Sequence, residues 1–206
     1  MTDRPYQVLS RTEVFQGAIF SVVSDVVSMP GGGSARRDWT HHPGASAVLA
    51  LDESGRVVLI RQYRHALGRP MWEIPAGLMD VPGESWVDAG RRELAEEADL
   101  VAARWDLLVE VHTSPGFSDQ LERVFLARGL EPVSEGDRFH KVHEEADLTV
   151  HRVDLDEAVA MVLGGEISNG STVAGILAAA RARDQRWAPL RSADAPPPPA
   201  PAHQVP

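Results

Sequence analysis

Residues 77–100 read GLMDVPGESWVDAGRRELAEEADL, and their spacing predicts a helix with an acidic face. Ser85 followed three residues later by Asp88 is a capping-box pattern, so the helix should begin at Ser85 and run to about Ala98. At about 100° per residue, three of its glutamates fall within about 100° of one another. These are Glu93, Glu96 and Glu97, and we expect them to point away from the core, beside an apolar stripe of Val87, Gly90, Leu94 and Ala98.

Three carboxylates on one helical face repel one another. Each such pair destabilises an isolated helix by roughly 0.2–0.5 kcal/mol. Arg92 can offset part of this repulsion by pairing with Glu96, four residues further on. A hard divalent cation, Mg²⁺ or Mn²⁺, would offset it better, because such ions bind carboxylate and carbonyl oxygens. On spacing alone, a solvated acidic surface is the competing interpretation.

The composition limits the function classes that are open to this chain. Its 206 residues make one domain, or one domain with an appendage, and 43% hydrophobic residues allow a proper core. Thirty acidic against 20 basic residues give a net charge of −10, which disfavours nonspecific binding to nucleic acid or to an anionic membrane. The absence of cysteine excludes disulfides, zinc–thiolate sites and thiol nucleophiles. No apolar run approaches the ~20 residues of a membrane span, and the N-terminus does not look like a signal peptide, which fits a cytoplasmic enzyme.

Strand patterns flank the acidic helix on both sides. Strand candidates at 5–10, 19–28 and 35–42, the second with alternating apolar and polar residues, form a small meander with a turn at 30–33. The apolar strands Ala45–Leu51 and 57–63 follow. Further strands at 105–111, 122–127 and 148–153 and helices at 154–163 and 171–183 predict an α+β fold with a mixed sheet. We therefore divide the chain into an N-terminal β segment over 1–43, a main domain over 44–187 and a disordered Pro/Ala-rich tail over 188–206.

The acidic stretch resembles the Nudix box, G-x5-E-x7-R-E-U-x-E-E-x-G-U, in which U is aliphatic. The match from Glu84 onward includes Arg92, Glu93, Leu94, Glu96, Glu97 and Leu100 at the family's spacing. The chain departs from the pattern twice, because six residues separate Gly77 from Glu84 and because Asp99 replaces the last glycine. A loop tolerates an extra residue, and Asp is one of the few residue types that tolerate a left-handed helix end.

Flanking motifs are similar to the ADP-ribose pyrophosphatase group of this family, most of all to its actinobacterial members. Pro115 lies 16 residues beyond Asp99, where a proline marks that group. Similar stretches at 62–64, 72–77, 143–147 and 165–167 extend the resemblance over roughly 5–185. The resemblance implies a Nudix α/β/α sandwich, a homodimer in which the N-terminal β segment is exchanged, and Mg²⁺-dependent hydrolysis of ADP-ribose to AMP and ribose 5-phosphate.

The same resemblance implies roles for the residues of the box. The metal ligands would be Glu93, Glu97 and Glu96, together with the backbone carbonyl of Ala76. Arg92 would hold the glutamates by charge-assisted hydrogen bonds, and Glu84 would orient Arg92 or a metal-bound water. The competing interpretation of Arg92 is an ordinary surface pair with Glu96.

The base that activates water is expected outside the box, on the long charged loop over 131–147. Glu144 and Glu145 are the acidic pair on this loop, and Glu145 is the preferred base. Such a loop can close over a substrate as a lid.

Binding the two ends of the substrate requires cations and stacking surfaces. The expected substrate-binding residues are Arg37, Arg64, Glu73, Phe117 and Asp119. Arg64 is the preferred phosphate ligand, with Arg61 as the rival, and Glu73 would accept from an adenine amine or ribose hydroxyls. Gln120 stands where similar proteins carry an acid, so a ligand role for that position stays open.

Two other functions compete with ADP-ribose hydrolysis. One is hydrolysis of a different diphosphate, such as an ADP-sugar, NADH or a nucleoside triphosphate, which the box itself does not distinguish. The other is a module that binds ADP-ribose without cleaving it. Such modules usually lose glutamates of the box, whereas this chain keeps Arg92, Glu93, Glu96 and Glu97.

Overall fold

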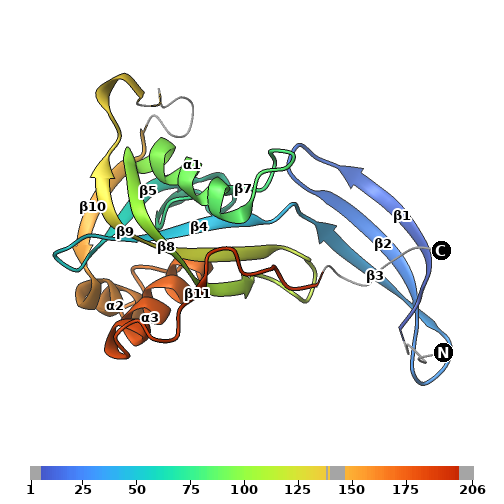
Figure 1. Ribbon diagram of the computed structural model, residues 1–206. Helices are drawn as coiled ribbons and strands as arrows, with labels where there is room; N and C mark the ends of the chain where they lie inside the picture. Colours follow the sequence, from blue (N-terminus) through green and yellow to red (C-terminus); the bar gives the residue numbers. More distant parts are fainter. Residues whose placement is uncertain (1–5, 138, 140–146, 200–206) are drawn as a thin grey trace. The chain divides into compact units, whose positions relative to one another are not determined.

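The computed structural model describes residues 6–137, 139 and 147–199 (Figure 1). The chain forms two compact units. Unit 1 comprises Met1–Gly44, His112–Leu121 and Pro196–Pro206, and unit 2 comprises Ala45–Val111 and Glu122–Ala195. Within the described ranges, no helix is both long enough and apolar enough to span a bilayer.

Unit 2 is built on a mixed sheet. Its path runs β10-β5-β4-β9-β8-β11, while β6 pairs with β5 and β7 pairs with β4. The strands are β4 (Ala45–Leu51), β5 (Arg56–Arg64), β6 (Arg69–Glu73), β7 (Ala76–Leu78), β8 (Leu100–His112), β9 (Leu121–Pro132), β10 (Thr149–Asp154) and β11 (Arg191–Ser192). β4 runs parallel to β9 and antiparallel to β5 and β7, so the predicted mixed sheet is confirmed.

Helices cover both faces of this sheet, which confirms the predicted α/β/α sandwich. The helices are α1 (Trp86–Ala98), α2 (Leu155–Leu163) and α3 (Gly170–Asp184), and two short 3-10 turns cover His65–Leu67 and Glu135–Asp137. Successive residues of a strand point to opposite faces. Accordingly, Val48 and Ala50 of β4 pack against Leu94 of α1, while Leu49 of the same strand packs with Ile176 of α3 (Figure 1).

The helix predicted from the acidic stretch begins and ends as its sequence indicates. Ser85 is the N-cap residue, and its side chain accepts from the backbone N–H of Asp88. Asp99 ends the helix in the left-handed region, with φ 55° and ψ 37°, so the aspartate adopts the conformation that the family's glycine would provide. The departure at Asp99 therefore leaves the helix end intact.

Unit 1 contains a three-stranded antiparallel meander. Its strands are β1 (Val8–Gln16), β2 (Ser21–Ser28) and β3 (Ser34–His41), in the order β1-β2-β3. Met29 accepts from Gly32 in the glycine-rich turn between β2 and β3. The loop between β8 and β9 belongs to this unit as well, and its Phe117 carbonyl accepts from Thr40 N at 2.7 Å. Several large apolar side chains of the unit are exposed: Tyr6, Leu9, Val14, Phe15, Ile19 and Phe20.

The sequence predicts disorder from residue 188 onward. For residues 191–195 this prediction is wrong, because they pair with the main domain. β11 pairs with β8, and Arg191 donates to Glu110 at 2.7 Å. Arg123 donates to the carbonyl of Ala195, also at 2.7 Å. Composition alone could not reveal this strand, because a two-residue strand depends on its partner rather than on its own propensity.

Candidate active site

The acidic face of α1 meets β7 at Ala76 and Gly77. Glu93 packs its carboxylate so closely on Gly77 that a Cβ there would lie 1.9 Å from Glu93 Oε1. One turn along the helix, Glu97 Oε2 accepts from the backbone N–H of Ala76 at 2.9 Å. A glycine at position 77 is therefore what allows the Glu93 carboxylate to approach the backbone of β7.

Arg92 lies among these carboxylates. Its Nε and Nη2 donate to the two oxygens of Glu84 at 3.1 and 3.0 Å. Its Nη1 donates to Glu93 and, at 3.5 Å, to Glu96. The hydrogen bonding of Glu84 is the largest cause that raises the pKa of Arg92 above its ordinary value. Arg92 thus makes more contacts than a surface pair with Glu96 would provide. We call this group the acidic corner; it consists of Ala76, Gly77, Glu84, Arg92, Glu93, Glu96 and Glu97.

The structure corrects one expectation about the acidic corner. Glu93 and Glu97 do not point away from the core, because they are 7% and 5% exposed. Both belong to the buried face of α1, together with Leu94 and Ala98. Burial of a carboxylate is costly unless charges or hydrogen bonds compensate it. Here Arg92 and the N–H of Ala76 supply compensation.

The donor set of the acidic corner suits a hard divalent cation. It consists of carboxylate oxygens from consecutive turns of one helix, next to the backbone of Ala76. In the part of the chain that the structure describes, no three acidic or histidine side chains are grouped around one metal position. Arg92 occupies the space among the glutamates instead, so a cation bound there would replace some of its contacts.

Arg64 and Glu73, both predicted to bind substrate, are paired with each other. Arg64 Nε donates to Glu73 Oε1 at 2.8 Å, and its Nη2 donates to Oε2 at 2.5 Å. Gln62 donates to the same carboxylate at 3.3 Å. Glu73 is only 2% exposed, so in this structure it orients Arg64 rather than facing a ligand. The rival, Arg61, lies over the ring of Trp72, with 5.5 Å from its Cζ to the ring centroid.

A second carboxylate, not predicted from the sequence, accompanies this pair. Glu122 lies at the start of β9, and Ser171 of α3 donates to its Oε2. Burial, the largest cause, and the charge of Glu73 raise the pKa of Glu122 to about 7, although Arg64 acts in the opposite direction. We call Arg64, Glu73, Glu122 and Ser171 the Arg64 cluster.

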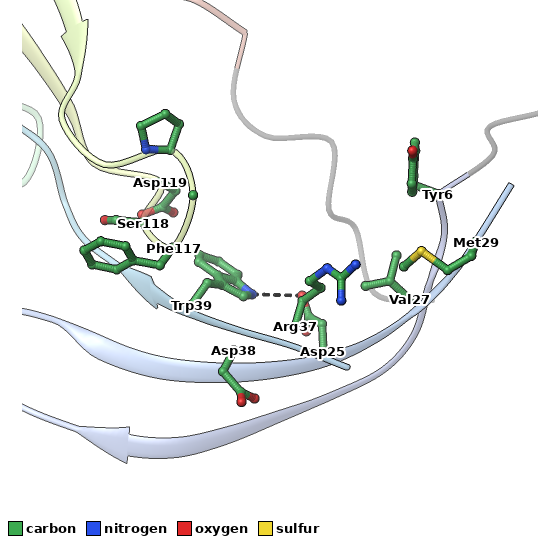
Figure 2. Close-up of a pocket in the computed structure, with 12 residues that line it drawn as sticks. Tyr6, Asp25, Val27, Met29, Arg37, Asp38, Trp39, Phe117, Ser118 and Asp119 are labelled. Atoms are coloured by element: carbon green, nitrogen blue, oxygen red, sulfur yellow. Dashed lines mark hydrogen bonds between the residues drawn. The ribbon is translucent and has the colours of Figure 1, made fainter. Parts of the chain in front are cut away.

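Unit 1 holds a pocket of about 350 Å³ that brings together three further predicted residues (Figure 2). Arg37, Phe117 and Asp119 all line it. Figure 2 shows Phe117 and Asp119 at one end and Tyr6 at the other. The remaining lining residues are Asp25, Val27, Met29, Asp38, Trp39, Pro115, Gly116 and Ser118. The pocket therefore offers aromatic rings, a guanidinium and carboxylates to a ligand.

Asp119 also ties the loop between β8 and β9 to the end of β3. Its Oδ2 lies 2.6 Å from Nδ1 of His41, and its Oδ1 accepts from the backbone N–H of His42 at 2.9 Å. Burial, the largest cause, lowers the pKa of His42. Neighbouring Gln120 accepts from Thr113 at 3.1 Å.

The predicted base lies outside the described residues, since the structure does not describe Glu144 or Glu145. Sequence reasoning missed Glu122 and Ser171 of the Arg64 cluster, and Tyr6, Trp39 and His41 of unit 1. The sequence shows only that Glu122 precedes an apolar strand. Many strands begin with a polar residue, so this position does not indicate a function. Trp39 lies within a strand pattern, where an aromatic residue is commonplace.

Known proteins are similar to this chain in sequence and in fold. Residues 40–174 match the family model described as the NUDIX domain. The chain is 44% identical to the ADP-ribose pyrophosphatase of Mycobacterium tuberculosis, over 86% of this chain and 84% of that protein. It is 31% identical to the ADP-ribose pyrophosphatase of Bacillus subtilis and 30% identical to the methanol dehydrogenase activator of Bacillus methanolicus, in each case over 81% of this chain and 88% of that protein. A solved ADP compounds hydrolase shares the fold, with a TM-score of 0.70 at 22% identity, over 88% of this chain and 96% of that one.

Proposed function

The chain belongs to the NUDIX family, and we propose that it hydrolyses ADP-ribose to AMP and ribose 5-phosphate with the help of a divalent cation, Mg²⁺ or Mn²⁺. The observation that carries this proposal is the acidic corner, where Glu93 and Glu97 are buried against Ala76 and Gly77. The choice of ADP-ribose rests on the 44% identical relative of that name and on Pro115.

The metal would be held by Glu93, Glu96 and Glu97 and by the carbonyl of Ala76. A bound divalent cation neutralises the charge of the pyrophosphate and lowers the pKa of a water molecule. Arg92 keeps the carboxylates in place, because its bonds to Glu93 and Glu96 fix their directions. Glu84 in turn fixes Arg92 with two hydrogen bonds. The chain's own task at the acidic corner is therefore to hold several carboxylates close together in spite of their repulsion.

A base must accept a proton from the attacking water, and Glu145 is our candidate, with Glu144 as the alternative. The glutamates of the acidic corner are engaged by Arg92 and Ala76, which favours a base from elsewhere. Changing Glu145 to Gln should lower kcat by about 10²–10⁴-fold, the usual contribution of a general base, with KM nearly unchanged. If Glu144→Gln is the inactive variant instead, Glu144 is the base. If both variants stay active, the base is another residue.

Arg64 of unit 2 would bind a phosphate group of the substrate, and Arg37, Phe117 and Asp119 of unit 1 are the other candidates for substrate binding. Arg64 supplies a guanidinium that suits a phosphate, while Arg37, Phe117 and Asp119 line a pocket with polar and aromatic surface. The exposed apolar residues of unit 1 support the further proposal of a homodimer, in which residues 1–43 are exchanged between cytoplasmic subunits. Deleting residues 5–42 should then abolish the dimer in light-scattering measurements and weaken ADP-ribose binding.

The proposed function is tested by an assay of purified protein with ADP-ribose, other ADP-sugars, NADH and nucleoside triphosphates. Each substrate is assayed with Mg²⁺, with Mn²⁺ and with EDTA, and products are identified by mass spectrometry. We expect AMP and ribose 5-phosphate in the highest yield from ADP-ribose, and no turnover in EDTA. If kcat/KM is higher for another diphosphate than for ADP-ribose, that diphosphate is the substrate. If the protein binds ADP-ribose in the presence of metal but turns over no substrate, it is a binding module and not an enzyme.

A further inference from the structure

Two neighbouring strands of unit 2 hold the first residue of α1. Ser46 of β4 and Arg123 of β9 are partners in the parallel register, so their side chains point to the same face of the sheet. The hydroxyl of Ser46 donates to the carbonyl of Trp86 at 2.8 Å. The guanidinium of Arg123 lies over the Trp86 ring, with 5.8 Å from its Cζ to the ring centroid. The start of α1 is therefore fixed both through its backbone and through its first side chain.

Arg123 is a buried charge that the C-terminal segment helps to hold. Its residue is 2% exposed, its Nε lies 3.0 Å from Oε1 of Glu110, and its Nη2 donates to the carbonyl of Ala195 at 2.7 Å. Arg191 of β11 donates to the same carboxylate of Glu110 at 2.7 Å. Replacing a buried ion pair by well-packed hydrophobic residues is often neutral or stabilising. Stability alone therefore does not account for a charge at position 123.

The start of α1 is continuous with the residues that orient the acidic corner. Because only Ser85 separates Trp86 from Glu84 in the chain, a displacement of Trp86 also displaces Glu84. Glu84 binds Arg92 with two hydrogen bonds, and Arg92 in turn donates to Glu93. A shift at the start of the helix therefore reaches a carboxylate that is proposed to bind the metal.

We propose that Arg123 is a positioning residue for the acidic corner, which it reaches through Trp86 and Glu84. By holding Trp86 in place, it keeps the pair of Glu84 and Arg92 in the arrangement that suits metal binding. This inference rests on the proposed function, since it takes the acidic corner as the metal site. Residues 191–195 share in the role, because they fix Arg123 through the carbonyl of Ala195 and through the carboxylate that β11 also binds.

A second arginine–acid pair joins the same two strands and provides a matched control. Arg128 of β9 donates to Asp106 of β8 at 2.7 Å, and its Cζ lies 4.9 Å from the centroid of the Trp187 ring. Arg128 and Arg123 are separated by an odd number of positions, so their side chains point to opposite faces of β9. Trp187 packs against the core that contains Ile176 of α3. This pair therefore has similar chemistry but supports the other face of the sheet.

The test removes each pair as a whole, so that neither variant keeps a buried charge without its partner. One double variant combines Arg123→Met with Glu110→Leu, and the control combines Arg128→Met with Asp106→Leu. The affinity for Mn²⁺ is measured by electron paramagnetic resonance, next to the melting temperature. We expect the first variant to bind Mn²⁺ about tenfold more weakly than the wild type, since residues that orient metal ligands typically contribute at least this much. Its melting temperature should stay within about 4 °C of the wild type, and the control should keep wild-type affinity.

Trp86→Leu approaches the same contact from the helix, and it leaves the pair of Arg123 and Glu110 in place. It carries the test if the first double variant does not fold, and it should weaken Mn²⁺ binding by a similar factor. Wild-type Mn²⁺ affinity in these variants, in a protein whose wild type hydrolyses ADP-ribose, would overturn the inference and leave the proposed function standing. Equal losses of affinity in the two double variants would also overturn it, because they would indicate a general effect on the sheet. A wild type that neither binds Mn²⁺ nor cleaves ADP-ribose would overturn both.

Discussion

The acidic corner and the Arg64 cluster, both in unit 2, each place one arginine among glutamates, and they differ in the number of glutamates. Each places a single arginine among buried or half-buried glutamates. The acidic corner gathers Glu84, Glu93, Glu96 and Glu97 near Arg92, so these five residues alone sum to −3 when all are ionised. The Arg64 cluster places Glu73 and Glu122 near Arg64, so these three residues alone sum to −1 when all are ionised.

The difference indicates which positive species completes each group. Burial, the largest cause, and the charge of Glu73 raise the pKa of Glu122 to about 7, so a proton suits the Arg64 cluster. Four carboxylates around one arginine are better matched by a divalent cation, which interacts with several carboxylates at once. The acidic corner is therefore suited to a metal, whereas the Arg64 cluster is suited to a proton and to an anionic ligand.

The largest expected effect comes from removing one carboxylate of the acidic corner. Glu97→Gln removes a charge that a cation needs, so kcat should fall by about 10²-fold or more at saturating Mg²⁺. Circular dichroism should show a retained fold, because loss of a negative charge also relieves repulsion. Glu53→Gln, in the exposed turn between β4 and β5, is the control and should keep full activity. Full activity of Glu97→Gln would show that the acidic corner has no part in catalysis.

A second change displaces a carboxylate without removing it. In Gly77→Ala the new Cβ would lie 1.9 Å from Glu93 Oε1, so the side chain of Glu93 must move away. We expect kcat/KM to fall by about 10–100-fold, as for other changes that misplace a ligand, with a small change in melting temperature. Gly170→Ala is the matched control, because its Cβ would meet nothing within 4 Å. An active Gly77→Ala enzyme would show that the position of Glu93 is not critical.

A third change weakens the pairing of Arg92 with Glu84, which orients it. Glu84→Gln keeps the size of the side chain and removes the charge that holds Arg92, so kcat/KM should fall by roughly tenfold. The neighbouring pair of Asp88 and Arg91, 2.6 Å apart on the exposed side of α1, offers a matched comparison. Asp88→Asn should leave kcat/KM unchanged. Equal kinetics of the two variants would mean that Arg92 needs no orienting partner.

The smallest effect is a stability difference that depends on pH. The pKa of Glu122 is raised from 4.5 to about 7, so the folded protein keeps a proton that the unfolded chain loses. The free energy of unfolding of the wild type should therefore decrease as pH rises from about 4.5 to 7 and then level off. Glu122→Gln escapes this loss, which is on the order of 3 kcal/mol at about 1.4 kcal/mol per pKa unit. Its melting temperature, relative to the wild type, should rise by about 2–4 °C per kcal/mol between pH 4.5 and 8. A pH-independent difference would contradict the raised pKa.

Much of the fold followed from local signals in the sequence. Ser85 and Asp99 set the ends of α1 through capping and a left-handed conformation, and both signals lie within a few residues of what they determine. The strand Ala45–Leu51 was predicted to the residue, because a run that is apolar except for Ser46 and lies between turn residues leaves few alternatives. β11 was missed, since its partner β8 lies far away in the chain.

The site was predictable where one helix carries it and less so where distant segments meet. Helical spacing brought Glu93, Glu96 and Glu97 together, but it misjudged their burial, because the close fit of Glu93 on Gly77 depends on β7. The Arg64 cluster depends on β5, β6, β9 and α3 at once, and no local pattern at Glu122 or Ser171 indicates such a meeting. Burial and charge, which give these two residues their properties, arise only in the folded chain.

The most direct test of the account is the binding of Mn²⁺, measured by electron paramagnetic resonance, to the wild type and to two variants. Because the acidic corner is matched to a metal and the Arg64 cluster to a proton, Glu97→Gln should weaken Mn²⁺ binding by at least about tenfold. Glu122→Gln should bind Mn²⁺ as the wild type does. Equal affinity of the wild type and Glu97→Gln, or a loss of affinity in Glu122→Gln as large as in Glu97→Gln, would contradict this division between the two clusters.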